Sequence, residues 1–336
     1  GLAMVDTVRG THFLSRHARL ALQAGEPYRI ARTLALEACG SVTRGRRSRR
    51  RTERLLKAGW ALAERTENPH ALGLLALASA ATANFQGRFP EAAEMCERAE
   101  RILRDRCTGV AWELDNTEIF RLHSHYWMGR WKDLAVRLPT LLREARERRD
   151  LFLATYLGTR SFHAVHLAGD QPEEAREGQQ RSIGAWSHQG FQVQHYWDWF
   201  AQCEIDLYVG ERAAAWRRVQ QRWREYIRSA LHFNQAILIE SLYLRARAAL
   251  AVLEEGGNAP EEWGTRKLLH QAERDARRIE RQGTAWGDAL AQLLRAGVAA
   301  STGDTDSAIT RAGSAEEDLQ GLAMNLHAAA ARRRRG

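Results

Sequence analysis

Two histidines stand at a spacing that could bind a metal ion. His163 and His166 are three residues apart, so both would lie on one face of a helix. A zinc site needs three or four ligands, and carboxylates usually orient its histidines. The sequence offers no His-Glu-x-x-His motif, and its four cysteines form no Cys-x-x-Cys pair. We therefore expect neither a metal ion nor any other cofactor.

A cluster of aromatic residues could instead bind a partner. Six His, Tyr and Trp residues fall within fourteen residues, from Trp186 to Trp199. His195, Trp197 and Trp199 lie off the apolar stripe of their expected helix. They either pack against a neighbouring helix, which is the commoner outcome, or line a surface as anchors, since Trp, Tyr and Arg dominate binding hot spots. Together with Trp186, they are the candidate partner-binding residues.

A run of arginines is the third feature that could bind something. Six arginines lie between Arg44 and Arg51, around Gly45. Arginines neutralise phosphates, so the run could bind nucleic acid or an acidic protein in a salt-dependent way. Such a run is more often a solvated turn, and only Arg332 to Arg335 forms a second basic stretch. We therefore do not expect nucleic acid as the partner.

The motifs of phosphoryl transfer do not occur in this sequence. There is no His-Arg-Asp motif, no Asp-Phe-Gly motif and no Gly-rich loop followed by a strand lysine. The three lysines, Lys57, Lys132 and Lys267, do not follow a glycine, so a nucleotide-binding P-loop is excluded as well. We expect that this chain is not itself an enzyme.

Composition indicates a well-mixed helical protein. The 336 residues are 44% hydrophobic and 27% charged, with a formal net charge of +9 carried almost wholly by arginine. This net positive charge is compatible with an acidic partner. The widely separated cysteines suggest no disulfide framework, and a reducing cytoplasm fits them best.

No segment is expected to enter a membrane. The apolar middle of the least charged stretch, from Ala71 to Ala83, has 13 residues, fewer than the roughly 20 that cross a bilayer. The sequence begins without a methionine and without a positively charged leader, so we expect a fragment of a larger multidomain protein.

A repeat of about 41 residues organises the elements that must position these side chains. Glycines recur in steps of 40 to 47 residues, and several are followed by an apolar stripe in one register. The glycines are Gly45, Gly87, Gly129, Gly169, Gly210, Gly256 and Gly303. The stripes that share the register are Ala92, Cys96, Ala99 and Leu103; Leu134, Leu138, Leu141 and Ala145; and Ala308, Ala312, Ala315 and Leu319. Spacings of 3 and 4 residues indicate buried helix faces.

The pattern therefore predicts that each repeat consists of a helix, a glycine turn and a second helix. Glycine can close a helix in the left-handed conformation without steric cost. A helix pair cannot bury its stripe alone, so neighbouring pairs must stack. We predict an all-α fold over residues 1–336, a single domain that is a right-handed superhelical α-solenoid of antiparallel, tetratricopeptide-like helix pairs.

Five stretches along the chain carry a resemblance to a known family. They are residues 1–9 (GLAMVDTVR), 20–38 (LALQAGEPYRIARTLALEA), 107–115 (CTGVAWELD), 190–196 (GFQVQHY) and 321–335 (GLAMNLHAAAARRRR). They resemble the C-terminal repeat region of large bacterial serine/threonine protein kinases of the myxobacterial and planctomycete type. In that family a kinase domain and a signal-transduction ATPase module precede the repeats, and the region continues beyond both ends of the present segment. No catalytic residue is implied for this chain.

The resemblance implies a non-catalytic sensor or regulatory scaffold. Its expected partner is a protein, or the adjacent kinase or ATPase domain. The alternative is a transcription-regulator-like sensor that recognises a small molecule or nucleic acid through the same helical repeats. An enzyme is the third class, and a deep pocket lined by His163, His166 and carboxylates would favour it.

Overall fold

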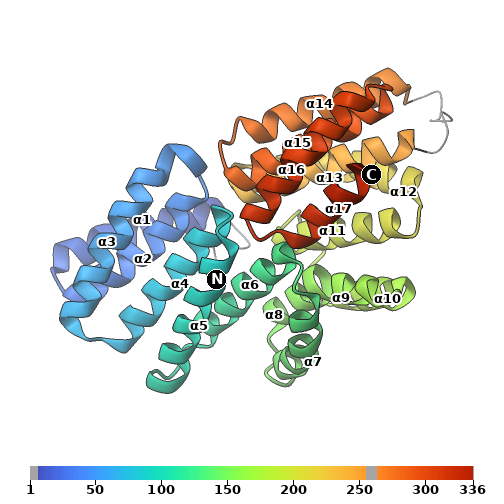
Figure 1. Ribbon diagram of the computed structural model, residues 1–336. Coiled ribbons are helices and arrows are strands. Elements are labelled where there is room, and N and C mark those ends of the chain that lie inside the picture. The colour runs from blue at the N-terminus through green and yellow to red at the C-terminus, as the bar shows by residue number, and fades with distance from the viewer. Residues whose placement is uncertain (1–6, 255–262, 336) are drawn as a thin grey trace. The chain divides into compact units, whose positions relative to one another are not determined.

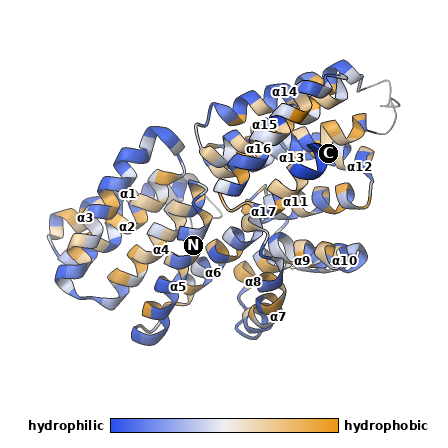
Figure 2. Cartoon of the chain, in the orientation of Figure 1, coloured by the Kyte–Doolittle hydropathy of each residue, from blue (hydrophilic) through white to orange (hydrophobic). Residues whose placement is uncertain are grey.

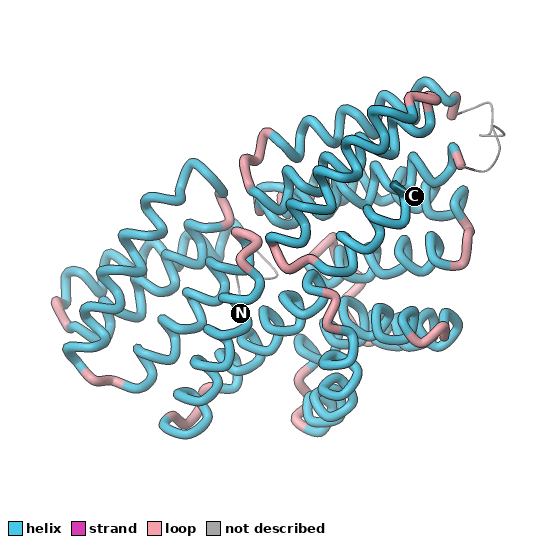
Figure 3. Tube along the Cα trace, in the orientation of Figure 1, coloured by secondary structure: helices cyan, strands magenta, loops and turns pink. Residues whose placement is uncertain are grey.

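The chain is helical wherever its structure is described. The computed structural model describes residues 7–254 and 263–335, and within those ranges helices are joined by short turns and no strand occurs (Figures 1 and 3). The predicted all-α class is confirmed. None of the helices in these ranges has both the length and the apolar character that a bilayer crossing requires.

The first of two compact units comprises Gly1–His125 together with Phe233–Gln235. Its helices are α1 (Thr7–Ala24), α2 (Pro27–Val42), the 3₁₀ helix η2 (Gly45–Ser48), α3 (Arg49–Thr66), α4 (Pro69–Phe85), α5 (Phe89–Arg106) and most of α6 (Ala111–Met128). Consecutive helices pack against one another, α2 on α3 and α4 on α5.

Helix α4 forms the centre of this first unit. It is the least charged stretch of the sequence, and Leu74, Leu75 and Leu77 on it are all buried. Its start is fixed locally, because the Asn68 side chain accepts a hydrogen bond from the backbone N–H of Ala71 and a proline follows Asn68. The 13-residue apolar stretch is therefore a core helix.

The second unit comprises Tyr126–His232 and Ala236–Gly336. Its helical elements are α7 (Trp131–Glu147), α8 (Leu151–Tyr156), the π-helical turn η3 (Leu157–Ser161), α9 (Phe162–Ala168), α10 (Pro172–Gly184), α11 (Val193–Tyr208), α12 (Arg212–Arg228), η4 (Leu231–Phe233), α13 (Gln235–Leu253), α14 (Thr265–Glu280), α15 (Ala285–Ser301), α16 (Thr305–Gly321) and α17 (Asn325–Arg335). The first residue of α13, Gln235, and the last of η4, Phe233, belong to the first unit.

Most of the predicted glycine turns join two helices. A left-handed backbone, with φ between 71° and 80°, occurs at Gly87, Gly129, Gly210 and Gly303. Gly169 differs, because its φ is −93° and the left-handed residue of that turn is Asp170, with φ 56°. Gly256 lies outside the described residues.

The predicted apolar stripes are buried. All four stripe residues of α5 and all four of α7 are buried, and so are Ala312, Ala315 and Leu319 of α16. Ala308, the first stripe residue of α16, is half-buried. Figure 2 shows hydrophobic and hydrophilic residues side by side on the same helices. The 3-4 spacing therefore identified the inner faces of these helices correctly.

Candidate functional site

A π-helical turn interrupts the long helix near the start of the second unit. The chain is helical from Leu151 to Ala168, but Leu157–Ser161 forms i to i+5 hydrogen-bonded turns between α8 and α9. Single π turns within α-helices are rare and occur frequently at functional sites. This one carries Arg160, a buried cation.

Close packing of α10 holds the π turn in place. Gly158 lies so near α10 that an added Cβ would stand 2.5 Å from the Cβ of Ser182. Gly178 of α10 makes the reciprocal approach, since a Cβ there would lie 2.7 Å from Cδ1 of Phe162. The absence of both side chains lets the two helices meet at this level.

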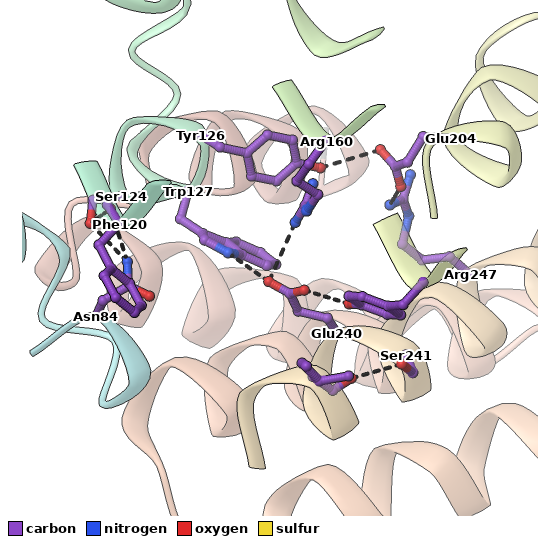
Figure 4. Close-up of polar contacts among 12 residues, drawn as sticks. Asn84, Phe120, Ser124, Tyr126, Trp127, Arg160, Glu204, Glu240, Ser241 and Arg247 are labelled. Carbon is purple, nitrogen blue, oxygen red and sulfur yellow. Dashed lines mark hydrogen bonds and ion pairs between the residues drawn. The ribbon is translucent and has the colours of Figure 1, made fainter. Parts of the chain in front are cut away.

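The carboxylate of Glu240 on α13 is the centre of a buried polar network (Figure 4). Its Oε1 accepts hydrogen bonds from Trp127 Nε1 at 3.1 Å and Arg160 Nη2 at 3.3 Å. Its Oε2 accepts one from the Tyr196 hydroxyl at 2.5 Å. Burial, reinforced by the charge of Glu240, raises the pKa of Tyr196 well above its ordinary value, so that hydroxyl remains a donor.

Aromatic rings surround the Arg160 guanidinium. Its Cζ lies 4.3 Å from the ring centre of Tyr126 and 4.1 Å from that of Phe200. Burial acts to lower the pKa of Arg160, but Glu240 together with the surrounding tyrosines raises it above its ordinary value. The arginine is therefore a charged group held by one carboxylate and two rings.

A second ion pair continues the network toward the surface. Glu204 of α11 lies 2.5 Å from Arg247 Nη1 and accepts a longer hydrogen bond, 3.5 Å, from the Tyr126 hydroxyl (Figure 4). The side chains of Glu204 and Arg247 are 15% and 34% exposed, whereas that of Arg160 is 2% exposed. The network is therefore buried at Arg160 and partly exposed to solvent at Arg247.

Two histidines of the second unit are kept uncharged. Burial, and then the nearby charge of Arg160, lowers the pKa of His163 to about 4. Burial, and then Arg247, lowers the pKa of His327 to about 4. His327 stacks on Trp127 with ring centres 5.1 Å apart. Both imidazoles are therefore neutral near pH 7.

The charged side chains of this network are paired, and the pKa of the thiol beside it is raised. Its two arginines face two carboxylates, so the charges of Arg160, Glu240, Glu204 and Arg247 balance. Burial raises the pKa of the neighbouring α11 thiol, Cys203, well above its ordinary value. Throughout the described residues, no group of three or more His, Cys, Asp or Glu side chains has a metal-binding arrangement.

The histidine pair that suggested a metal site is divided between two environments. His163 is fully buried, and its Nδ1 lies 2.8 Å from the carbonyl oxygen of Thr159. His166 lies nearer the surface, with Nδ1 3.0 Å from Oε1 of Gln171. Each ring is thus engaged with a separate local partner.

The predicted partner-binding residues lie on or beside α11. His195, Trp197 and Trp199 are buried, with exposed fractions of 7%, 7% and 1%. Trp197 packs on Tyr156 of α8, with ring centres 4.8 Å apart. Trp186 follows α10, is half-buried, and donates a hydrogen bond from Nε1 to Gln192 at 2.8 Å. The structure brings the four near one helix, and a partner-binding role for them stays a prediction.

Sequence reasoning did not identify Arg160 and Glu240. A signal for Glu240 does exist, because it is the one charged residue in the otherwise apolar or uncharged segment 234–244. A lone carboxylate in a buried helix needs a partner. The sequence around Arg160 contains no comparable signal, because no residue near it in the sequence predicts a π turn.

In comparisons with known proteins, no family model, curated protein or solved structure matches this chain.

Proposed function

We propose that this chain is a non-catalytic binding scaffold, the regulatory repeat region of a signalling serine/threonine kinase or ATPase. The observation that carries the proposal is the recurrence of buried helix pairs about a left-handed glycine at Gly87, Gly129 and Gly210. Elements that recur in this way stack on their neighbours and leave an extended surface for a partner. The kinase association rests on the sequence resemblance.

The scaffold we propose is a right-handed solenoid of tetratricopeptide-like pairs that works in the bacterial cytoplasm. The steps between the glycines at 87, 129, 169 and 210 are 42, 40 and 41 residues, longer than the 34 of a tetratricopeptide repeat. A partner would act by changing the curvature of this array or its packing on the adjacent domain.

A binding measurement tests this function. The domains encoded in the same reading frame are expressed separately, and their binding to this chain is measured by isothermal titration calorimetry, together with ATP turnover. We expect saturable binding to a kinase or ATPase domain and a change in its turnover. Trp186→Ala should weaken binding, whereas Trp112→Ala, at a 37% exposed tryptophan in the first unit, should not. A reading frame without such a domain, or no binding, would contradict the proposal.

A small-molecule sensor is the second candidate, because two buried nitrogens at the network lack a hydrogen-bond partner in the described part of the chain. Arg160 Nη1 and His163 Nε2 have no hydrogen-bond partner within the described residues. Buried polar groups of this kind are normally satisfied by protein, water or ligand. The ligand would be recognised as a hydrogen-bond acceptor at Arg160. A ligand that raises the melting temperature of the wild-type chain and not that of Arg160→Met would favour this candidate.

A further inference from the structure

The arginine run of the first unit folds into a compact basic surface. Arg46 and Arg47 lie on η2, and Arg49 to Arg51 form the first turn of α3. All five side chains are exposed, as is Arg44, which precedes η2. Six guanidinium groups are thus gathered where the chain turns from α2 into α3.

Most of these arginines are not neutralised. Arg51 pairs with Glu37 at 3.1 Å and Arg49 with Glu53 at 3.1 Å. No acidic side chain within the described residues pairs with the other four, which are Arg44, Arg46, Arg47 and Arg50. The surface therefore keeps an excess of positive charge that attracts an anion.

The arginines also oppose the stability of their own helix. The N-terminal end of a helix favours acidic residues, yet the first turn of α3 has none. Ser48 stands at the N-cap position but does not cap the helix, because its hydroxyl donates toward the carbonyl oxygens of Ser41 and Gly45. Residues that lower the stability of their own helix, with no local interaction to compensate, are typical of functional sites.

A pocket with an aromatic wall lies at this surface. Its volume is about 600 Å³, and it is open to solvent. The residues that line it are Arg44, Arg47, Ser48, Arg51 and Phe233. Phe233 is 73% exposed. Its segment belongs to the same compact unit, and the Gln235 N–H donates to the Thr43 carbonyl at 2.8 Å.

We propose that this pocket binds a nucleotide unit, with the phosphate held by Arg44 and Arg47 and the base stacked on Phe233. An arginine cluster alone is more often a solvated turn, but an exposed ring beside unpaired guanidinium groups matches both parts of a nucleotide. The unit can come from a free nucleotide or from a single strand, since both present the same chemistry. This activity is additional to the proposed scaffold role and lies in the first unit.

An acidic peptide fits the site less well. Its carboxylates would pair with the arginines, but a carboxylate does not stack on an aromatic ring such as Phe233, which is 73% exposed. A base provides a flat ring for that face whatever its sequence, and such stacking is sequence-tolerant. The nucleotide is therefore the occupant that engages both the unpaired arginines and the aromatic ring of the pocket.

Fluorescence anisotropy of a labelled ten-residue oligothymidylate tests the proposal on the full chain. We expect binding at 50 mM salt that weakens as salt rises, with a log–log slope of about −1.4 for the two unpaired pocket arginines, Arg44 and Arg47. Replacing Phe233 by Ala should weaken binding roughly 5- to 100-fold, whereas Phe233→Trp should retain it. The double variant Arg44→Ala, Arg47→Ala should weaken binding at least about 10-fold.

The control is Arg65→Ala, an exposed arginine at the far end of α3 that carries the same charge. It should leave the binding constant unchanged. Competition by ADP at similar concentration would assign the site to free nucleotides, and competition only by unlabelled strand would assign it to single strands. The proposal is overturned if tripolyphosphate or polyglutamate competes as well as the strand, if Phe233→Ala binds normally, or if no binding occurs at 50 mM salt. Circular dichroism of each variant checks that it is folded.

Discussion

The guanidinium of Arg160 lies 3.3 Å from the carboxylate of Glu240, although 80 residues separate them in the sequence. The side chains are 2% and 4% exposed, so the pair is removed from solvent. Desolvation of two charges is costly; the rings of Tyr126 and Phe200 contact the arginine, and Tyr196 and Trp127 donate hydrogen bonds to the Glu240 carboxylate, which offsets that cost. This pair ties α13 to the π turn of the second unit.

Breaking this pair on one side should be strongly destabilising. Glu240→Gln keeps the size of the side chain but leaves the Arg160 charge buried without a counterion. We expect a loss of about 3–5 kcal/mol in the free energy of unfolding, measured in urea. The double variant Arg160→Met, Glu240→Leu should recover much of that loss, because both charges of the pair are removed. Additive losses in the double variant would show that the two side chains act independently.

The close approach of α10 to the π turn should not tolerate a methyl group at Gly158. The new Cβ would lie 2.5 Å from Ser182 Cβ, an atom that cannot move without its backbone. We expect Gly158→Ala to lower stability by about 1–3 kcal/mol. Gly184→Ala at the end of α10 is the matched control, since nothing lies within 4 Å of its added Cβ. Equal losses of stability in Gly158→Ala and Gly184→Ala would show that the close approach of Ser182 to Gly158 does not limit the residue at position 158.

Stability should fall in mild acid because of His163. Its pKa is about 4 in the folded chain against an ordinary 6.5, so between these values the unfolded chain binds more protons. Stability is therefore lost as the pH falls from 6.5 to 4, by about 3 kcal/mol from this residue. Urea unfolding of the wild type and of His163→Gln at pH 7.5 and pH 4.5 measures the difference. A wild-type pH dependence that His163→Gln leaves unchanged would refute this assignment.

Two of the three candidate tryptophans, Trp186 and Trp199, should respond differently to truncation. Trp199 is 1% exposed and packs on Tyr226, with ring centres 5.6 Å apart. We expect Trp199→Ala to lose about 3–5 kcal/mol and to lower the melting temperature markedly. Trp186 is half-buried, so its truncation should lower the melting temperature less. If Trp199→Ala instead keeps its melting temperature and loses a partner, Trp199 is a binding anchor.

Local signals in the sequence predicted the helices and their inner faces well. The 3-4-3-4 spacing of Val193, Tyr196, Phe200, Cys203 and Leu207 predicts one helix face, and along α11 the first four are buried and Leu207 is half-buried. The turn at Gly210 has the left-handed backbone that the glycine suggests. Both properties depend on residues within one or two helical turns, and such properties are encoded locally.

Contacts between distant segments could not be predicted in the same way. Glu240 meets Trp127 and Tyr196 across 113 and 44 residues. Their meeting depends on how α6, α11 and α13 pack, and a single helix pattern does not specify that. The Arg44 to Arg51 run was visible in the sequence, but its pocket depends on Phe233, which is close only in the folded first unit.

A crystal structure of the chain tests the central claim, that consecutive helix pairs form a right-handed repeat scaffold. We expect antiparallel pairs that advance by about 41 residues per step, each packed on the pair before it, with a right-handed superhelical turn. A left-handed array, or a bundle in which non-consecutive pairs are neighbours, would contradict the claim.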